Sequence, residues 1–247
     1  MKKLITLILA AGKGTRMKSD LPKVIHKING KELVKFVIDQ AKKAGSDDIW
    51  LITGHKSELV EEATSGLGVK YVLQKEQLGT GHAVMMAEEV LKDTSGDVLI
   101  LCGDVPLLKP ETLKKFREHH NNSGAVATVM TTDFDDPFGY GRIVKNSNGE
   151  IIRIVEQKDA SEEEKKIKEI NSGVYIIDKD ELFLSLKNIS SDNAGREYYL
   201  TDVIGILKNR NAKVGTFKIK DNNEILGINT VEQLKLAESI IDPENKK

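Results

Sequence analysis

The sequence has very little cysteine and no concentration of positive charge. Cys102 is the single cysteine among 247 residues, which excludes an internal disulfide framework and favours a reducing compartment such as the cytoplasm. The formal net charge is −1 and no basic stretch dominates, which disfavours a nucleic-acid or anionic-membrane surface. No apolar run approaches the length of a membrane span. We therefore expect no nucleic-acid or membrane partner, although a few local cations are enough to hold a small anionic ligand.

The first residues imitate a short signal peptide, because Lys2 and Lys3 precede an apolar run that ends at Ala11. The competing interpretation is a buried first strand that leads directly into Gly12. We favour the strand, since cleavage after Ala11 would place the glycine-containing segment up to Arg16 at a new N-terminus.

Apolar runs of strand length alternate with helical periodicity through the first half of the chain. The predicted strands are Leu4–Ala10, Ile49–Thr53, Lys70–Leu73, Val98–Cys102 and Ala125–Thr131. Between them, apolar residues recur at helical spacing over 34–41 and 83–91. This order predicts an α/β fold with a doubly wound, Rossmann-like, mixed but mostly parallel sheet.

The second half has a different pattern. A hairpin is predicted from Arg142–Val144 and Ile151–Val155, which flank a turn at Asn146-Ser147-Asn148-Gly149. The charged stretch 158–169 is predicted to be a helical insert with a solvated face. Further strands are expected at Val174–Ile177 and Val214–Ile219, and helices near 201–208 and 230–240. With no linker or internal repeat, one compact unit is the simplest organisation.

The turn after the first strand has the composition of a phosphate loop. It reads Leu9-Ala10-Ala11-Gly12-Lys13-Gly14-Thr15-Arg16-Met17, and Pro22-Lys23 follows six residues later. Glycines at a strand's carboxyl end let backbone N–H groups approach a phosphate, and Arg16 and Lys23 add the cations that a triphosphate requires. Met17 breaks both the Walker and the dinucleotide patterns, and the second strand ends without the carboxylate that NAD binding needs.

Six further segments accompany this loop. They are Gln77-Leu78-Gly79-Thr80-Gly81-His82-Ala83, Gly103-Asp104-Val105-Pro106-Leu107, Gly139-Tyr140-Gly141-Arg142-Ile143, Ile154-Val155-Glu156-Gln157-Lys158-Asp159-Ala160, Glu169-Ile170-Asn171-Ser172-Gly173 and Glu197-Tyr198-Tyr199-Leu200-Thr201-Asp202. In this order the motifs resemble those of sugar-nucleotide pyrophosphorylases. The resemblance extends to about residue 236 and is most specific to the N-terminal uridylyltransferase domain of the bifunctional N-acetylglucosamine-1-phosphate uridyltransferase/glucosamine-1-phosphate acetyltransferases.

The resemblance implies the nucleotide-diphospho-sugar transferase fold and a cytoplasmic, magnesium-dependent enzyme of peptidoglycan precursor synthesis. Its substrates would be UTP and N-acetylglucosamine 1-phosphate. The implied nucleotide-binding residues are Leu9, Ala10, Ala11, Gly12, Gly14, Gln74, Gly79, Thr80 and Gly103. The implied sugar-binding residues are Gly141, Glu156, Asn171 and Asn229. The implied catalytic residues are Arg16, Lys23 and Asp104, with Mg²⁺ held by Asp104 and Asn229.

The same resemblance implies a division of the chain. Residues 1–236 would form one nucleotidyltransferase domain, with 1–124 mainly nucleotide-binding and 125–229 mainly sugar-binding, including the hairpin. Residues 237–247 would form a helix end and a tail, and 242–245 mark either a truncation or a natural short form. Because the chain has no hexapeptide repeats, we expect neither acetyltransferase activity nor the trimer that those repeats build, and we favour a monomer.

Each key residue also has a structural alternative. Asp104 could be the N-cap of the next helix, and Asn229 competes with Thr230 as the cap of the last one. Cys102 stands where the family often has a larger side chain, and on its strand it is expected to be a small buried core residue. Two other functions stay open: transfer to another sugar or from another base, and a non-catalytic nucleotide-sugar-binding module.

Overall fold

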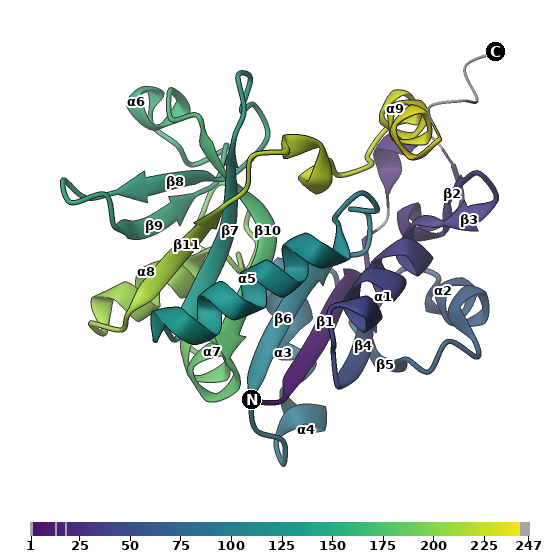
Figure 1. Cartoon of the computed structure of the whole chain (residues 1–247), viewed down its shortest axis with the longest axis horizontal. Coiled ribbons are helices and arrows are strands. Elements are labelled where there is room, and N and C mark those ends of the chain that lie inside the picture. The colour runs from purple at the N-terminus through teal and green to yellow at the C-terminus, as the bar shows by residue number, and fades with distance from the viewer. Residues whose placement is uncertain (1, 13, 18, 243–247) are drawn as a thin grey trace.

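The computed structural model describes residues 2–12, 14–17 and 19–242 (Figure 1). Within these residues, nine strands form one mixed sheet. The spatial order of its main path is β11 (Val214–Lys218), β7 (Ala127–Asp133), β10 (Glu169–Asp178), β6 (Asp97–Cys102), β1 (Leu4–Ala10), β4 (Asp48–Thr53) and β5 (Lys70–Leu73). Strands β6, β1, β4 and β5 run parallel, whereas β10 is antiparallel to both of its neighbours. The doubly wound, mostly parallel α/β fold is confirmed.

Helices cover both faces of this sheet (Figure 1). The α-helices are α1 (Leu33–Lys43), α2 (Ser57–Thr64), α3 (Thr80–Met85), α4 (Glu88–Leu91), α5 (Pro110–Ser123), α6 (Glu162–Lys165), α7 (Lys179–Leu186), α8 (Asp202–Asn209) and α9 (Val231–Ile241). Three short 3-10 helices are η1 (Thr15–Met17), η2 (Lys23–Ile25) and η3 (Asn222–Ile225), and a separate small hairpin pairs β2 (Lys27–Ile28) with β3 (Lys31–Glu32).

The alternation of side chains along β1 explains why helices pack on both sides. Ile5 and Leu7 belong to one core, together with residues of α3, α7 and α8. Leu4 and Ile8 point the other way, into a second core with α1 and α5. A strand that is apolar on both faces must be covered on both faces, which is the requirement of a parallel sheet.

The predicted hairpin is present and branches from the main path of the sheet at β10. Strands β8 (Arg142–Lys145) and β9 (Ile151–Val155) pair antiparallel, and β8 also pairs with β10. The chain then crosses back above the sheet after β11, so that α9 packs near β2 (Figure 1). The last segment therefore joins the two halves.

Several boundaries and burial predictions were wrong. Of the predicted helical insert at 158–169, only α6 is helical, and Glu169 already begins β10. The apolar stripe over 83–91 is divided between α3 and α4, and Val90 is 40% exposed. Cys102 is half-buried, not fully buried, because it ends its strand beside a cavity. The predicted tail beyond 242 lies outside the described residues.

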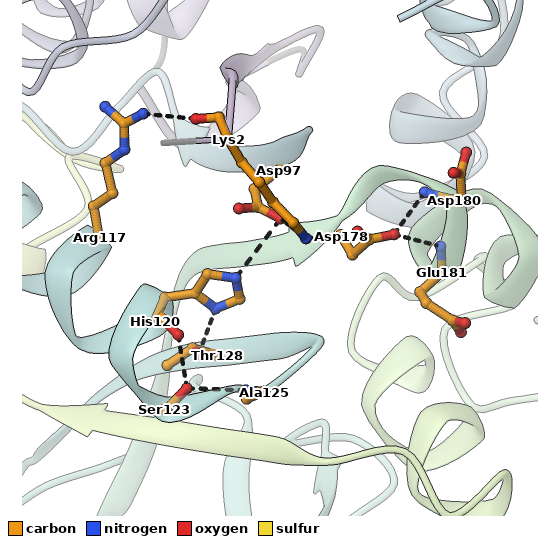
Figure 2. Close-up of polar contacts among 10 residues, drawn as sticks. All are labelled: Lys2, Asp97, Arg117, His120, Ser123, Ala125, Thr128, Asp178, Asp180 and Glu181. Atoms are coloured by element: carbon orange, nitrogen blue, oxygen red, sulfur yellow. Dashed lines mark hydrogen bonds and ion pairs between the residues drawn. The ribbon is translucent and has the colours of Figure 1, made fainter. Parts of the chain in front are cut away.

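A network of polar side chains secures the end of the sheet where β1 begins (Figure 2). Lys2 Nζ donates to Asp97 Oδ1 at 3.2 Å and to Asp178 Oδ2 at 3.0 Å. His120 Nε2 lies 3.8 Å from Asp97 Oδ1, and its Nδ1 lies 2.8 Å from Thr128 Oγ1. Asp178 also accepts hydrogen bonds from two backbone N–H groups at the start of α7. This network connects β1, β6, β7, β10 and two helices.

Candidate active site

The turn after β1 brings Lys23 against a glycine. Gly14 has a φ of +65°, and a Cβ at this position would lie 2.7 Å from Cβ of Lys23. Both the left-handed backbone and the close approach favour glycine here. Gly14 thus allows Lys23, the first residue of η2, to pack directly against the loop.

Four of the predicted residues meet beyond this turn. Lys23 Nζ forms a short ion pair with Asp104 Oδ2 and donates to Asn229 Oδ1 at 2.9 Å. Arg16 Nη2 donates to the same Asn229 oxygen at 2.7 Å. These side chains come from the turn after β1, the turn after β6 and the residue before the last helix's cap. The structure thus brings two cations, a carboxylate and an amide oxygen together at the carboxyl ends of parallel strands, where open α/β sheets bind ligands.

Neither Asp104 nor Asn229 caps a helix. Thr230 is the N-cap of α9, and its hydroxyl and the Gln233 side chain form a complete capping box. The N-cap of α5 is Lys109, not Asp104. Ile228 N–H donates to the Asp104 carbonyl at 2.9 Å, which joins the two backbone segments, and Asn229 Nδ2 donates to the Gly227 carbonyl at 3.1 Å.

A cavity of about 400 Å³ opens next to this cluster. Nine predicted residues line it: Leu9, Ala10, Ala11, Gly12, Lys23, Gln74, Gly79, Thr80 and Asp104. Gly103 lies outside that lining but packs tightly behind it, since its N–H donates to the Leu9 carbonyl at 2.9 Å. Gln77 and Glu197 also line the cavity, and the sequence analysis assigned neither a role, although both belong to the motifs quoted above.

Gln74 presents a fixed amide to this cavity. It is 2% exposed, and its Nε2 donates to the Gly79 carbonyl at 3.1 Å and lies 2.9 Å from Nδ1 of His82. Both amide hydrogens are therefore used within the protein. The remaining group, Oε1, is an acceptor, and it suits a ligand that offers an N–H.

The glycine loop at 77–81 is bound to the segment 197–200 across the cavity. Gly81 N–H donates to the Tyr198 carbonyl at 2.7 Å, and Tyr198 N–H donates to the Leu78 carbonyl at 2.8 Å. At Gly79, a Cβ would lie 2.6 Å from the Tyr198 carbonyl oxygen, and φ is +119°. Two motifs far apart in the sequence are thus one structural unit.

Three of the four predicted sugar-binding residues, Gly141, Glu156 and Asn171, form a second cluster, whereas the fourth, Asn229, lies with Arg16 and Lys23. Asn171 N–H donates to the Gly141 carbonyl at 2.9 Å. A Cβ at Gly141 would lie 3.5 Å from Cβ of Asn171 and 3.6 Å from Oε1 of Glu156. Glu156 Oε1 also accepts from Thr201 Oγ1 at 3.0 Å, a partner that the sequence analysis did not identify. These residues do not line the 400 Å³ cavity; Glu156 lines a neighbouring one of about 450 Å³.

Burial changes the titration of two groups near these clusters. Burial raises the pKa of Glu156 above its ordinary value, and the charge of Asp202 adds to this effect, while the hydrogen bond from Thr201 opposes it. Burial and the charge of Asp104 raise the pKa of the Cys102 thiol to about 12. Cys102 is therefore a neutral thiol in the pH range of cells, and the thiolate needed for nucleophilic chemistry is scarce.

Asp104 and Asn229 fit a hard divalent cation. Their oxygens already share one cation, the Lys23 ammonium, which is a stand-in of the right charge sign. At Gly227 a Cβ would lie 3.5 Å from Asp104 Oδ2 and 3.4 Å from Asn229 Nδ2, so the absence of a side chain leaves room beside both groups. No group of three or more His, Cys, Asp or Glu residues that could hold a metal occurs in the described part of the chain. A metal here would rely on ligands from phosphate and water, as magnesium does.

Comparisons with known proteins identify the family of this chain. The family model described as nucleotidyl transferase matches residues 5–223. The chain is 51% identical over 241 residues to "Bifunctional protein GlmU" of Caldanaerobacter subterraneus subsp. tengcongensis, covering 98% of this chain and 52% of that protein. It is also 51% identical over 235 residues to "Bifunctional protein GlmU" of Streptococcus gordonii, covering 95% of this chain and 51% of that protein. The chain thus spans about half the length of these relatives.

Solved structures with low sequence identity share the fold. A UDP-glucose pyrophosphorylase complexed with UDP-glucose superposes with a TM-score of 0.79 at 22% identity, covering 99% of this chain and 100% of that chain. A putative glucose-1-phosphate thymidylyltransferase from Bacillus anthracis superposes with a TM-score of 0.77 at 21% identity, covering 99% of this chain and 97% of that chain. No helix among the described residues is long and apolar enough to cross a bilayer. Because the family model matches most of its length, the chain belongs to the nucleotidyl transferase family.

Proposed function

We propose that this chain is a UDP-N-acetylglucosamine pyrophosphorylase, which transfers UMP from UTP to N-acetylglucosamine 1-phosphate and releases pyrophosphate. The observation that carries the proposal is the meeting of Arg16, Lys23, Asp104 and Asn229 beside the cavity that the glycine loop lines. The motif resemblance and the 51% identity to two proteins named GlmU support the choice of substrates.

The chemistry requires positioning and charge neutralisation more than proton transfer. An oxygen of the sugar phosphate attacks the α-phosphorus of UTP while the bond to pyrophosphate breaks. The sugar phosphate is already a nucleophile at neutral pH, so a general base is not required. Lys23 and Arg16 would neutralise the phosphate oxygens, and the guanidinium of Arg16 would bind them through two N–H groups.

Asp104 and Asn229 would hold magnesium, and Lys23 would turn from them to the phosphates. A bound magnesium ion would supply a template for the triphosphate and stabilise negative charge on its α-phosphate. The exposed fractions of the Lys23 and Asp104 side chains are 19% and 15%, which leaves both accessible to a ligand.

The same proposal divides the site between base and sugar. Oε1 of Gln74 would accept from N3–H of uracil; cytosine has no hydrogen at N3 and would be disfavoured. Gly141, Glu156 and Asn171 would bind the sugar, so that residues 1–124 serve mainly the nucleotide and 125–229 mainly the sugar. We further propose that the enzyme works in the cytoplasm as a monomer, which light scattering after size-exclusion chromatography would test.

The experiment is a pyrophosphate-release assay with magnesium, pairing each of the four nucleoside triphosphates with several sugar 1-phosphates. We expect UTP with N-acetylglucosamine 1-phosphate to be the preferred pair. A preference for glucose 1-phosphate would instead favour the activity named for the UDP-glucose pyrophosphorylase neighbour. Binding of UDP-N-acetylglucosamine without turnover of any pair would favour a non-catalytic binding module.

A further inference from the structure

Tyr175 lies buried directly behind Asn171. It is 2% exposed, and its hydroxyl accepts a hydrogen bond from Asn171 Nδ2 at 2.6 Å. The two residues are four positions apart on β10, where regular strand geometry would separate their Cα atoms by about 13 Å. A direct contact between them therefore needs a special backbone.

A break in the strand supplies this backbone. In the pairing with β7, Asn171 lies opposite Thr131 and Tyr175 lies opposite Val129, so four steps on β10 match two on its partner. Gly173, with a φ of +78°, sits inside this bulge. A bulge changes the direction in which a nearby side chain points, and here that side chain is Asn171 of the proposed sugar site.

The bulge is fixed by hydrogen bonds of its own. Ser172 Oγ donates to the Met130 carbonyl at 2.7 Å and accepts from Val174 N–H at 3.2 Å. Gly173 N–H donates to Asn171 Oδ1 at 3.1 Å. The sequence Asn171-Ser172-Gly173 is thus an anchored bulge and not an ordinary turn.

Both ends of the Asn171 amide are consequently held by the protein. Oδ1 receives the Gly173 N–H and one Nδ2 hydrogen goes to the Tyr175 hydroxyl, which leaves one donor and one acceptor position. Without Tyr175, only Gly173 would define which way this amide faces. Burial and the charge of Glu156 raise the pKa of Tyr175 well above its ordinary value, so the hydroxyl stays protonated at any pH found in cells.

We propose that Tyr175 is a positioning residue for sugar recognition, which orients the Asn171 amide toward the sugar of the nucleotide-sugar. This inference rests on the proposed function. It assigns Tyr175 no contact with the base or with the phosphates, which the proposed function places in the cavity that Gln74 and Lys23 line. Removal of the Tyr175 hydroxyl should therefore affect sugar binding alone.

The test is Tyr175→Phe, which keeps the ring and removes the hydroxyl. We expect the affinity for UDP-N-acetylglucosamine, measured by calorimetry, and the KM for N-acetylglucosamine 1-phosphate to weaken about 10-fold, the effect of one lost hydrogen bond. The affinity for UDP, the KM for UTP and kcat should change less than about 2-fold. A matched control is Tyr71→Phe, which removes a hydroxyl 3.0 Å from Thr64 Oγ1, away from both clusters, and should leave every value unchanged.

The outcomes separate this inference from the function on which it rests. Equal affinity of wild type and Tyr175→Phe for UDP-N-acetylglucosamine would overturn the positioning role and leave the proposed function standing. Equal losses for UDP and UDP-N-acetylglucosamine would also overturn it, because they would indicate a general structural role. Failure of the wild type to bind UDP-N-acetylglucosamine would overturn both.

Discussion

The two ends of the central sheet use similar charged groups for different purposes. At the end where β1 begins, Lys2, Asp97, Asp178 and His120 connect strands to each other and to helices (Figure 2). At the other end, the cluster of Arg16, Lys23, Asp104 and Asn229 connects loops.

The difference lies in what each contact secures. Asp178 caps α7 and His120 bridges α5 to β7, so these contacts are part of the framework. The opposite cluster caps no helix, because Thr230 already caps α9. Its partners can be exchanged for a ligand without unfolding an element. The loop cluster is therefore a candidate site, because it caps no helix, whereas the cluster at the other end belongs to the framework.

The largest expected effect is on turnover at the loop cluster. Asp104→Ala should lower kcat at least about 1,000-fold, because it removes a proposed metal ligand and the charge that organises Lys23. Its free energy of unfolding should fall by about 1 kcal/mol at most, since Lys23 keeps its contact with Asn229 Oδ1 and its long side chain can turn toward solvent. Pyrophosphate release and urea unfolding would measure the two quantities. Wild-type turnover in the purified variant would refute the assignment.

A smaller loss is expected when the cation is removed and the carboxylate stays. Lys23→Met keeps most of the aliphatic stem and should lower kcat/KM about 100-fold, the value of a charge-assisted contact with phosphate that strengthens in the transition state. The matched control is Lys70→Met, which removes an exposed lysine paired with Asp48 at the edge strand β5. Equal effects of the two variants would contradict a special role for Lys23.

At the framework end the expected effect is on stability. Asp97→Asn replaces a buried carboxylate that Lys2 and His120 contact, and it should lower the free energy of unfolding by about 2 kcal/mol. The kcat of the folded fraction should stay within about 2-fold of wild type. A stable but inactive Asp97→Asn variant would show that the two ends of the sheet are not separate in role.

A pH titration of stability tests the contribution of the Asp97 carboxylate to the framework. Burial raises the pKa of Asp97, but the hydrogen bonds and charges of His120 and Lys2 outweigh it, so the net pKa falls below the ordinary 3.8. A carboxyl with a lowered folded pKa contributes stability above its unfolded pKa and loses it as pH falls through the folded value. The stability difference between wild type and Asp97→Asn should therefore be constant near neutral pH and shrink below pH 3.8. A difference that grows on acidification would contradict this origin.

The smallest effect expected is at Arg16. Arg16→Lys keeps the charge but loses the two-pronged geometry, and it should lower kcat/KM about 10-fold. Steady-state kinetics at varied UTP would measure it. A loss as large as that of Lys23→Met would mean that guanidinium geometry, and not charge alone, is decisive.

The strands of the first half of the chain could be predicted because their signals are local. β1 and β5 have the predicted bounds, and a glycine lies two residues from one end of each, Gly12 after β1 and Gly68 before β5. The start of β10 was missed because Asn171-Ser172-Gly173 has the composition of a turn, whereas in the structure it is a bulge held by Met130. The break between α3 and α4 likewise has no proline or glycine to signal it.

The candidate site could be predicted only in part. Residues at strand ends and in glycine loops were identifiable, because parallel strands bring their carboxyl ends together. Tyr175 and Thr201, which orient Asn171 and Glu156, had no such signal, since their contacts exist only after folding. Arg142 was not expected in the core, yet it is 2% exposed and donates to Gln157 Oε1 at 2.7 Å.

The most direct test of the account measures pyrophosphate release from UTP and N-acetylglucosamine 1-phosphate, with and without magnesium, for wild type and Asp104→Ala. We predict magnesium-dependent release by the wild type and at least about a 1,000-fold slower release by the variant. Release that is independent of the Asp104 carboxylate would contradict the claim that the phosphate loop and this carboxylate act on one polyphosphate.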